Sequence, residues 1–329
     1  MASGNSGDTL GVHRQAVISA AELIDFSADC IIVQDDEFDL NATVYKKVEL
    51  PEVRNTLKRA HGIRVFWSNE ARARYRQEYA KVPQAPSPNA ALMNFLKEDC
   101  DLSLEKADRS VMEHLNFCYE YGINHMKNHS AVPLLLHSAM GGWTDDFPLP
   151  LDKVSKLKAL VTPEEFAQIQ AFPSILRLLH DFTLSDTLFY RFADLARLRS
   201  LSCQRVLDNT PLEISADQLW VALNYQLIHA LDFMPLVDWS DKVADAHFQQ
   251  VRLLYGLLAK TGKLYLKLNL DVGCYRPDGG KFTLKEAVAS CTVDDMQSAR
   301  NSLRGMNRYF AEKTNFPLEM KLNFQTPTE

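Results

Sequence analysis

The stretch SADQLWVALNYQLIHALDF, residues 215–233, decides the fold class, because its apolar residues recur at the spacing of a helix. Ser215 is placed to cap the first turn of this helix. A second start is TPEEF, where Thr162 is the expected N-cap, Pro163 takes the first helical position and two acidic residues follow. The chain is therefore predicted to be mainly α-helical. Further helices are expected at residues 12–26, 69–81, 103–129, 185–207, 241–260 and 292–314.

Two segments near the C-terminus instead alternate apolar and polar residues, which is typical of strands with one buried face. They are LYLKLNLDV, residues 264–272, and FPLEMKLNF, residues 316–324. We expect them to pair in one small antiparallel sheet, with RPDGGKF as a turn after the first. The segments CIIV and TVYKKVEL, on either side of the acidic turn QDDEFDLNA, can form a short N-terminal hairpin.

Composition places the chain among ordinary globular proteins, with 46% hydrophobic and 24% charged residues in 329. We expect a flexible arm at residues 1–12, a small subdomain of segregated charge at 13–82, and a main helical domain at 83–329. An irregular joint is expected near residues 141–151, and three prolines in VPQAPSPNA separate the subdomain from the main domain.

The charge and the cysteines exclude several classes of protein. A net charge of -6 argues against a DNA-binding protein that is basic overall. The six cysteines are scattered without a C-x-x-C pair, so no zinc ribbon is expected and a reducing, cytoplasmic setting fits best. The first residues do not form a signal peptide, and no apolar run approaches about 18 residues, so no membrane span is expected.

The stretch HLNFCYEYGINHMKNH places His114, Cys118, His125 and His129 on one face of the helix expected at 103–129. Four residues spread over about 22 Å of helix cannot converge on one ion. We therefore interpret the stripe as the polar edge of a buried helix, with Cys118 in the core, and expect no metal. In the alternative interpretation, His125 and His129, one turn apart, share a metal with a carboxylate from elsewhere.

The stretch LLHDF contains His180 and Asp181, and this pair resembles the centre of the HD-type phosphohydrolases. That resemblance implies a metal-dependent hydrolase, with His137 upstream and Asp232 or Asp238 downstream as the outer ligands. The alternative is that Asp181 caps or starts the next helix. The chain has no Walker A loop, G-x-S-x-G elbow, kinase set or H-E-x-x-H motif, which favours a protein that is not an enzyme.

A basic segment, KRAHGIRVFWSNEARARYRQEYAK at residues 58–81, carries seven basic and two acidic residues, whereas residues 1–57 have a net charge of -6. Guanidinium groups bind phosphate, and neighbouring aromatic rings can stack on bases. RNA contact through this segment is one interpretation. The other is that it packs on the acidic segment, in the same subunit or another. The candidate RNA-binding residues are Arg59, Arg64, Arg72, Arg74 and Arg76.

The hypothesis that we favour is a structural protein that assembles with itself, without a cofactor. Segregated charge suits subunit contacts, and Trp67, Trp143, Trp220 and Trp239 lie in or beside expected loops, where interfaces recruit aromatic residues. In size and helical content the chain resembles the capsid proteins of small double-stranded RNA viruses of the partitivirus type. That resemblance implies a dimer-based icosahedral shell around RNA, with no catalytic residues and a place in the virion. A metal-dependent hydrolase and a helical module that binds a partner protein are the alternatives.

Overall fold

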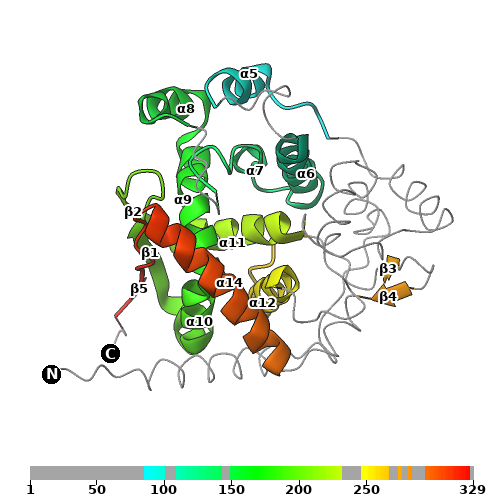
Figure 1. Ribbon diagram of the computed structural model, residues 1–329, viewed down its shortest axis with the longest axis vertical. Coiled ribbons are helices and arrows are strands. Elements are labelled where there is room, and N and C mark those ends of the chain that lie inside the picture. Colours follow the sequence, from blue (N-terminus) through cyan, green and yellow to red (C-terminus); the bar gives the residue numbers. More distant parts are fainter. Residues whose placement is uncertain are drawn as a thin grey trace.

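The structure is a computed structural model that describes residues 85–100, 109–142, 149–231, 246–266, 273–275, 281–283 and 293–326 (Figure 1). This part of the chain is mainly helical with small antiparallel sheets, which confirms the predicted fold class. No helix in the described part is long and apolar enough to cross a membrane. The predicted arm, the charge-segregated subdomain and the N-terminal hairpin lie outside the described residues, as does most of the joint near 141–151.

Helix α9 (Pro163–His180) runs through the centre of the molecule and begins where the sequence predicts (Figure 1). The Thr162 hydroxyl accepts a hydrogen bond from the backbone N–H of Glu165 at 3.2 Å, and the Glu165 carboxylate accepts one from the N–H of Thr162 at 2.8 Å. This reciprocal arrangement satisfies two backbone donors that a helix start leaves unpaired. The two hydrogen bonds fix the first turn of α9, which packs against most of the other described helices.

Helix α11 (Ala216–Leu231) also begins as predicted, directly after Ser215. The Ser215 hydroxyl accepts from the N–H of Gln218 at 3.3 Å, and the Gln218 side chain accepts from the N–H of Ser215 at 3.0 Å. Trp220 on this helix is only 3% exposed, so its predicted place beside a loop at an interface is wrong. It faces the larger hydrophobic core because the apolar side of α11 packs on α9.

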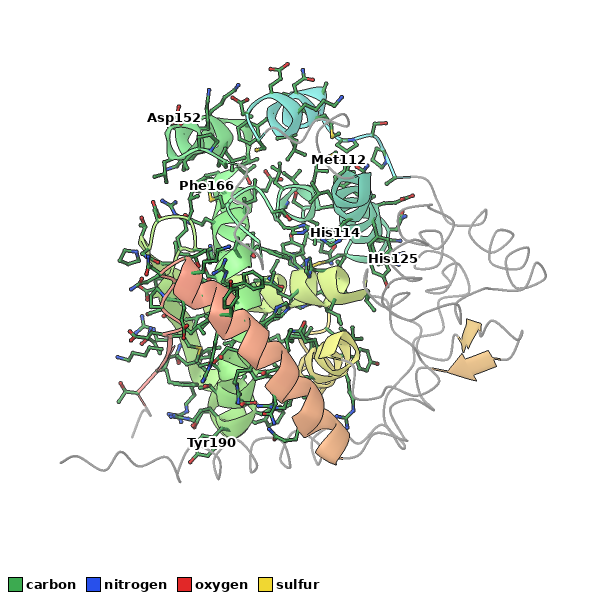
Figure 2. All side chains as sticks on the ribbon, in the orientation of Figure 1. Met112, His114, His125, Asp152, Phe166 and Tyr190 are labelled. Carbon is green, nitrogen blue, oxygen red and sulfur yellow. The ribbon has the colours of Figure 1, made fainter. Side chains whose placement is uncertain are left out.

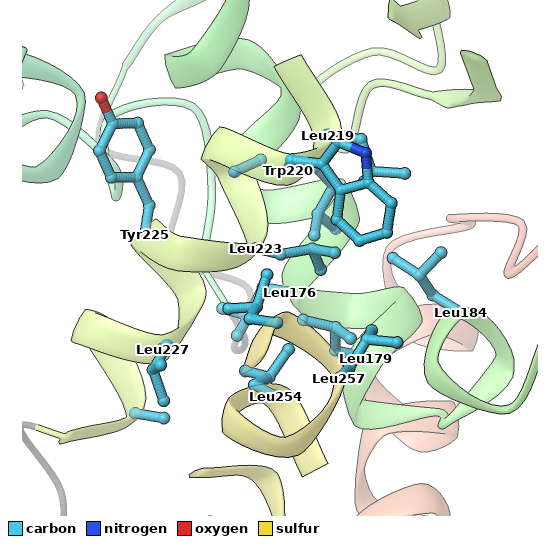
Figure 3. Close-up of a cluster of buried hydrophobic side chains, with 14 of the residues drawn as sticks. Leu176, Leu179, Leu184, Leu219, Trp220, Leu223, Tyr225, Leu227, Leu254 and Leu257 are labelled. Atoms are coloured by element: carbon cyan, nitrogen blue, oxygen red, sulfur yellow. The ribbon is translucent and has the colours of Figure 1, made fainter. Parts of the chain in front are cut away.

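That larger core joins α9 and α11 to α10 (Thr183–Tyr190), α12 (Ala246–Lys260) and α14 (Val293–Lys313). Figure 3 shows leucines from α9, α10, α11 and α12 converging there. The starts expected for the last two of these helices, at residues 241 and 292, lie outside the described residues. The core buries Leu176, Leu179, Leu184, Leu219, Leu223, Leu254 and Leu257, among others.

A second, smaller core lies around the N-terminal end of α9, where the N-terminal helices of the described part gather (Figure 1). Its residues come mainly from α5 (Ala90–Glu98), α6 (Arg109–His125), α7 (Val132–Leu135) and α8 (Val154–Leu160), which follows the short 3-10 helix η3 (Leu151–Lys153). The first turns of α9 complete it. Its members include Leu96, Leu115, Leu135, Leu136, Leu157 and Ile169.

The long helix predicted over residues 185–207 is wrong. Helix α10 ends at Tyr190, a 3-10 helix, η4 (Phe192–Arg197), follows, and the chain then enters strand β1 (Leu198–Gln204). Strands pair with β1 along both of its edges. These long-range hydrogen bonds and the burial of one strand face override a local apolar spacing that also fits a helix.

The sheet around β1 has the order β2-β1-β5 and is antiparallel throughout. Strand β2 (Pro211–Ser215) precedes α11 directly, and strand β5 (Lys321–Phe324) ends the described chain. Leu201 at the centre pairs with Ile214 on one side and Leu322 on the other. The predicted strand at the C-terminus is therefore present, and its partner among the described residues is β1.

Residues 264–266 form no strand because helix α11 holds the backbone beside them. The Asn224 side chain donates to the carbonyl of Lys263 at 2.9 Å and accepts from the N–H of Tyr265 at 2.8 Å. Residues 267–272 lie outside the described part. A small hairpin follows, in which β3 (Gly273–Tyr275) pairs with β4 (Lys281–Thr283) on either side of the predicted turn.

Candidate functional site

Three histidines and a cysteine from three segments meet inside the described part. His114 and Cys118 are one turn apart on α6, His137 follows α7, and His229 lies in the last turn of α11. The Nε2 atoms of His114 and His137 are 2.9 Å apart, and the Cys118 sulfur is 4.0 Å from His114 Nδ1. Figure 2 shows His114 on the part of α6 that lies near α11. We call these four residues the His-Cys cluster.

The three imidazole rings of the cluster meet edge to face. The ring centroid of His114 is 4.8 Å from that of His137 and 4.8 Å from that of His229, and the last two are 5.0 Å apart. The Phe172 ring on α9 packs on two of the histidines, with ring centroids 4.6 Å from His137 and 5.4 Å from His229. Cys118 and His137 are buried, whereas His114 and His229 are half-buried, so one side of the cluster faces the interior.

The hydrogen bonds of the cluster fix where its protons lie when the rings are neutral. A carbonyl can only accept, so the 2.7 Å contact from His137 Nδ1 to the Leu134 carbonyl places a proton on Nδ1. His137 Nε2 then accepts, and His114 Nε2 must donate to it. His114 Nδ1 is left as the acceptor that faces the Cys118 thiol. A directed chain therefore runs from the thiol through two imidazoles to the carbonyl.

The His-Cys cluster lies where the two hydrophobic cores meet. Cys118 and Phe172 belong to the larger core, whereas Leu115, next to His114, and Leu136, next to His137, belong to the smaller one. Polar groups enclosed by apolar side chains are costly unless they pair with one another or bind an ion. The His-Cys cluster can therefore act as a hydrogen-bonded network that links the two cores, or as a metal site.

Among the described residues, one set of three or more His, Cys, Asp or Glu side chains brings its ligand atoms together, and it is His114, Cys118 and His137. Their ligand atoms lie within 4.8 Å of one another. Imidazole nitrogen and thiolate sulfur are donors that suit zinc and copper and do not suit calcium or magnesium. The set therefore has the chemistry of a transition-metal site.

The structure does not bring His125 and His129 together at a metal site. Helix α6 ends at His125, so His129 lies beyond the helix and the two are not on consecutive turns. His125 packs against Tyr121 with ring centroids 4.7 Å apart, and His129 stacks on Tyr265 at 5.0 Å. Burial lowers the pKa of His129. Of the histidine stripe, only its first half contributes to the His-Cys cluster.

The structure also separates His137 from His180 and Asp181. His137 joins the His-Cys cluster, and no set of ligand atoms in the described part contains it together with either of the other two. Asp181 is the C-cap of α9, and its carboxylate accepts hydrogen bonds from Arg308 at 2.9 Å and from Thr183. The prediction that Asp181 caps or starts the next helix is therefore wrong, because Asp181 ends α9 and the residue before the next helix is Phe182.

Arginines on α14 neutralise the acidic groups around the start of α10. Arg300 forms a buried ion pair with Asp186, and Arg304 donates to the backbone carbonyl of Asp181 at 2.8 Å. Both guanidinium groups also lie over the Phe182 ring, at 4.4 and 6.0 Å from its centroid. These contacts hold α14 against the junction of α9 and α10. Because the carboxylates of Asp181 and Asp186 are paired with arginine, they do not form a metal site in the described part of the chain.

The remaining predicted residues lie outside the described part of the chain. They are Asp232, Asp238 and the five candidate RNA-binding residues Arg59, Arg64, Arg72, Arg74 and Arg76.

The sequence linked two of the four residues of the His-Cys cluster. The spacing of His114 and Cys118 placed both on one face of a helix, whereas His137 was named only as an outer ligand for His180 and Asp181, and His229 was not named. His137 and His229 each stand alone in an apolar run. A single histidine in such a run is more often a core residue than a ligand. The local signal that marks them is a histidine in an otherwise apolar stretch, LLLH for His137 and LIHAL for His229.

Three comparisons with known proteins found no relative of the chain. No family model matches the chain, no curated protein is similar to it in sequence, and no solved structure matches it.

Proposed function

We propose that the chain is a non-enzymatic structural protein that assembles with copies of itself, as the capsid proteins of small double-stranded RNA viruses do. The observation that carries the proposal is the exposure of large apolar side chains on the surface of the described part. Leu151, Tyr190 and Tyr309 are 59%, 67% and 60% exposed. Tyrosine is enriched at protein interfaces, where its ring buries a large area at a low cost in conformational entropy.

The state of the buried polar groups supports the same proposal over the hydrolase alternative. A hydrolase of the HD type needs carboxylate and imidazole groups that are open to a metal and to substrate. The Asp181 carboxylate instead accepts from Arg308 and Thr183, and the Asp186 carboxylate is paired with Arg300. These two carboxylates therefore stabilise the contact between helices.

RNA contact through the basic segment at residues 58–81 is part of the proposal and rests on the sequence. Phosphate contacts release counterions, so their affinity falls steeply with added salt. We expect the full chain to bind duplex RNA with an affinity that falls as salt rises. Replacing Arg72 and Arg76 together by glutamine reduces that slope by about 1–2 units. Binding that is independent of salt contradicts the phosphate contact.

The assembly proposal is tested by charged substitutions at the exposed tyrosines. Tyr190→Asp and Tyr309→Asp each place a carboxylate in the proposed interface, where burying an unpaired charge is unfavourable. We expect sedimentation velocity to show smaller particles for at least one of these variants. Asn301→Asp is the matched control, because Asn301 is exposed on the same helix as Tyr309 and its oxygen already accepts from Gln297 at 2.9 Å.

The control variant must sediment like the unchanged protein. If both tyrosine variants also sediment like it, the exposed tyrosines are not part of an interface. A wild-type chain that stays a monomer and retains a different protein in a pull-down favours the interaction module instead.

A further inference from the structure

We propose that the His-Cys cluster is a structural zinc site, in which His114, Cys118 and His137, whose ligand atoms already converge, are joined by His229 as the fourth ligand. The inference is independent of the assembly proposal, because it concerns the interior of a single chain. It assigns a metal to residues that otherwise serve as a hydrogen-bonded joint between the two cores.

The donor set fits a closed zinc site. Structural zinc sites are tetrahedral and take four protein ligands from cysteine sulfur and histidine nitrogen, with no place kept for water. Three imidazoles and one thiolate provide such a set once His229 joins the three converging residues. Cys118 and His137 are buried, and the Phe172 ring packs on His137 and His229, so one side of the site is apolar.

The ring positions match those around a single ion. With a Zn–N bond of about 2.0–2.1 Å, three imidazoles on a tetrahedral ion have ring centroids about 5 Å apart. The observed separations of 4.8, 4.8 and 5.0 Å agree with that value. The nitrogens of His229 are not among the ligand atoms that already converge, so this ring turns when the ion binds. The same bond length puts two ligand nitrogens about 3.3 Å apart. His114 and His137 Nε2 are 2.9 Å apart, so these two rings need to separate by only a few tenths of an ångström.

The second hydrogen bond of His137 prepares it as a ligand. Metal-binding histidines commonly donate their other ring N–H to a backbone carbonyl, which fixes the ring and its tautomer. His137 Nδ1 makes that bond to Leu134 at 2.7 Å, so its Nε2 lone pair points into the cluster. A ligand that is already oriented loses less entropy when the ion binds.

Binding requires two proton movements that balance. The Cys118 thiol loses its proton to solvent and binds as thiolate, and His114 exchanges its Nε2 proton for one on Nδ1, so that Nε2 can bind the ion. One proton is therefore released for each zinc bound, and zinc affinity rises with pH. No electron is transferred, since zinc has no redox chemistry at such a site.

The position of the cluster gives the ion its role. Its ligands come from α6, from the turn after α7 and from α11, and they lie at the border between the two cores. An ion held there cross-links segments that are distant in sequence. Because zinc binds the folded chain and not the unfolded one, it raises Tm by about 5–10 °C when it is in large excess over its Kd.

The experiment uses the full chain, stripped with a chelator and then titrated with Zn²⁺ or Co²⁺. We expect one equivalent of zinc by elemental analysis, a rise in Tm on zinc addition, and a sulfur-to-cobalt charge-transfer band that marks Cys118 as a ligand. His137→Gln is expected to abolish stoichiometric binding. His129→Gln is the matched control, since His129 lies outside the cluster, and it must bind one equivalent.

Each result decides for or against the site. A cobalt complex without a sulfur charge-transfer band, or a stripped wild-type chain that binds no zinc, overturns the proposal and leaves the cluster as a hydrogen-bonded joint. Equal loss of zinc in the two histidine variants also overturns it. If His137→Gln does not fold, the cobalt spectrum of the unchanged chain decides alone. None of these results depends on the state of assembly.

Discussion

Asp186 and Arg300 form a buried ion pair between α10 and α14, with 11% and 2% of their side chains exposed. Removing one partner of such a pair leaves the other charge buried without compensation. We predict that Asp186→Asn lowers the free energy of unfolding by about 3–5 kcal/mol. Urea denaturation at pH 7, followed by circular dichroism, measures the change.

The control for this prediction is Asp208→Asn, which removes a pair near the surface. Asp208 is bound by Arg205 at 2.6 and 2.8 Å, and its exposure leaves the pair only about 0–1 kcal/mol of stabilisation at pH 7. Arg205 lowers the pKa of Asp208 to about 2, so this contribution is full above the ordinary pKa of 3.8 and is lost as pH falls toward 2. Equal losses at pH 7 for the two variants contradict the difference in burial.

The candidate site shows how far single residues can be read from sequence. Helical spacing correctly aligned His114 with Cys118, because that relation depends only on local geometry. His137 joined them through a turn that the sequence does not specify. His125 and His129 were separated by the end of α6, an event that spacing alone does not locate. A cluster assembled from three segments is a property of packing, and periodicity carries no information about it.

Helix α6 approaches α7 closely because it carries Gly122. A Cβ at this position would lie 2.5 Å from Leu134 Cδ1 and 3.2 Å from Ala131 Cβ. Leu134 is fully buried and has little room to move. We predict that Gly122→Ala lowers the free energy of unfolding by about 1–3 kcal/mol, although alanine is the better helix former. Thermal and urea unfolding measure the change.

Gly305 on α14 is the matched control, because a Cβ there would meet nothing within 4 Å. Gly305→Ala is expected to raise the free energy of unfolding by about 0.5–1 kcal/mol through helix propensity alone. If Gly122→Ala has the same stabilising effect, α6 and α7 are not in close contact at this point.

Elements whose signals are local were predicted correctly from the sequence. The starts of α9 and α11 depend on Thr162 and Ser215, each of which bonds with a residue three positions later. Strand β1 was not predicted, because its partners lie before α11 and at the end of the chain. Its residues acquire their strand conformation from pairing, whereas their apolar spacing is compatible with both a helix and a strand.

At the scale of the whole described body, two cores follow one another along α9 and meet at the His-Cys cluster. The buried pair of Arg300 with Asp186, and a pair of the exposed Arg308 with the buried Asp181, attach α14 to the start of α10. The described body therefore uses its buried polar chemistry for architecture. Its exposed apolar residues, Leu151, Tyr190 and Tyr309, are the groups left for contact with another molecule.

Self-assembly is the central claim of this account, and absolute molar mass tests it most directly. Light scattering after size exclusion, repeated over a wide range of protein concentration, gives that mass without a shape assumption. Self-assembly predicts a molar mass that is a multiple of the 37.3 kDa chain. The mass is expected to begin at that of a dimer and to rise with protein concentration toward that of a closed particle. A mass of 37.3 kDa at every concentration contradicts it.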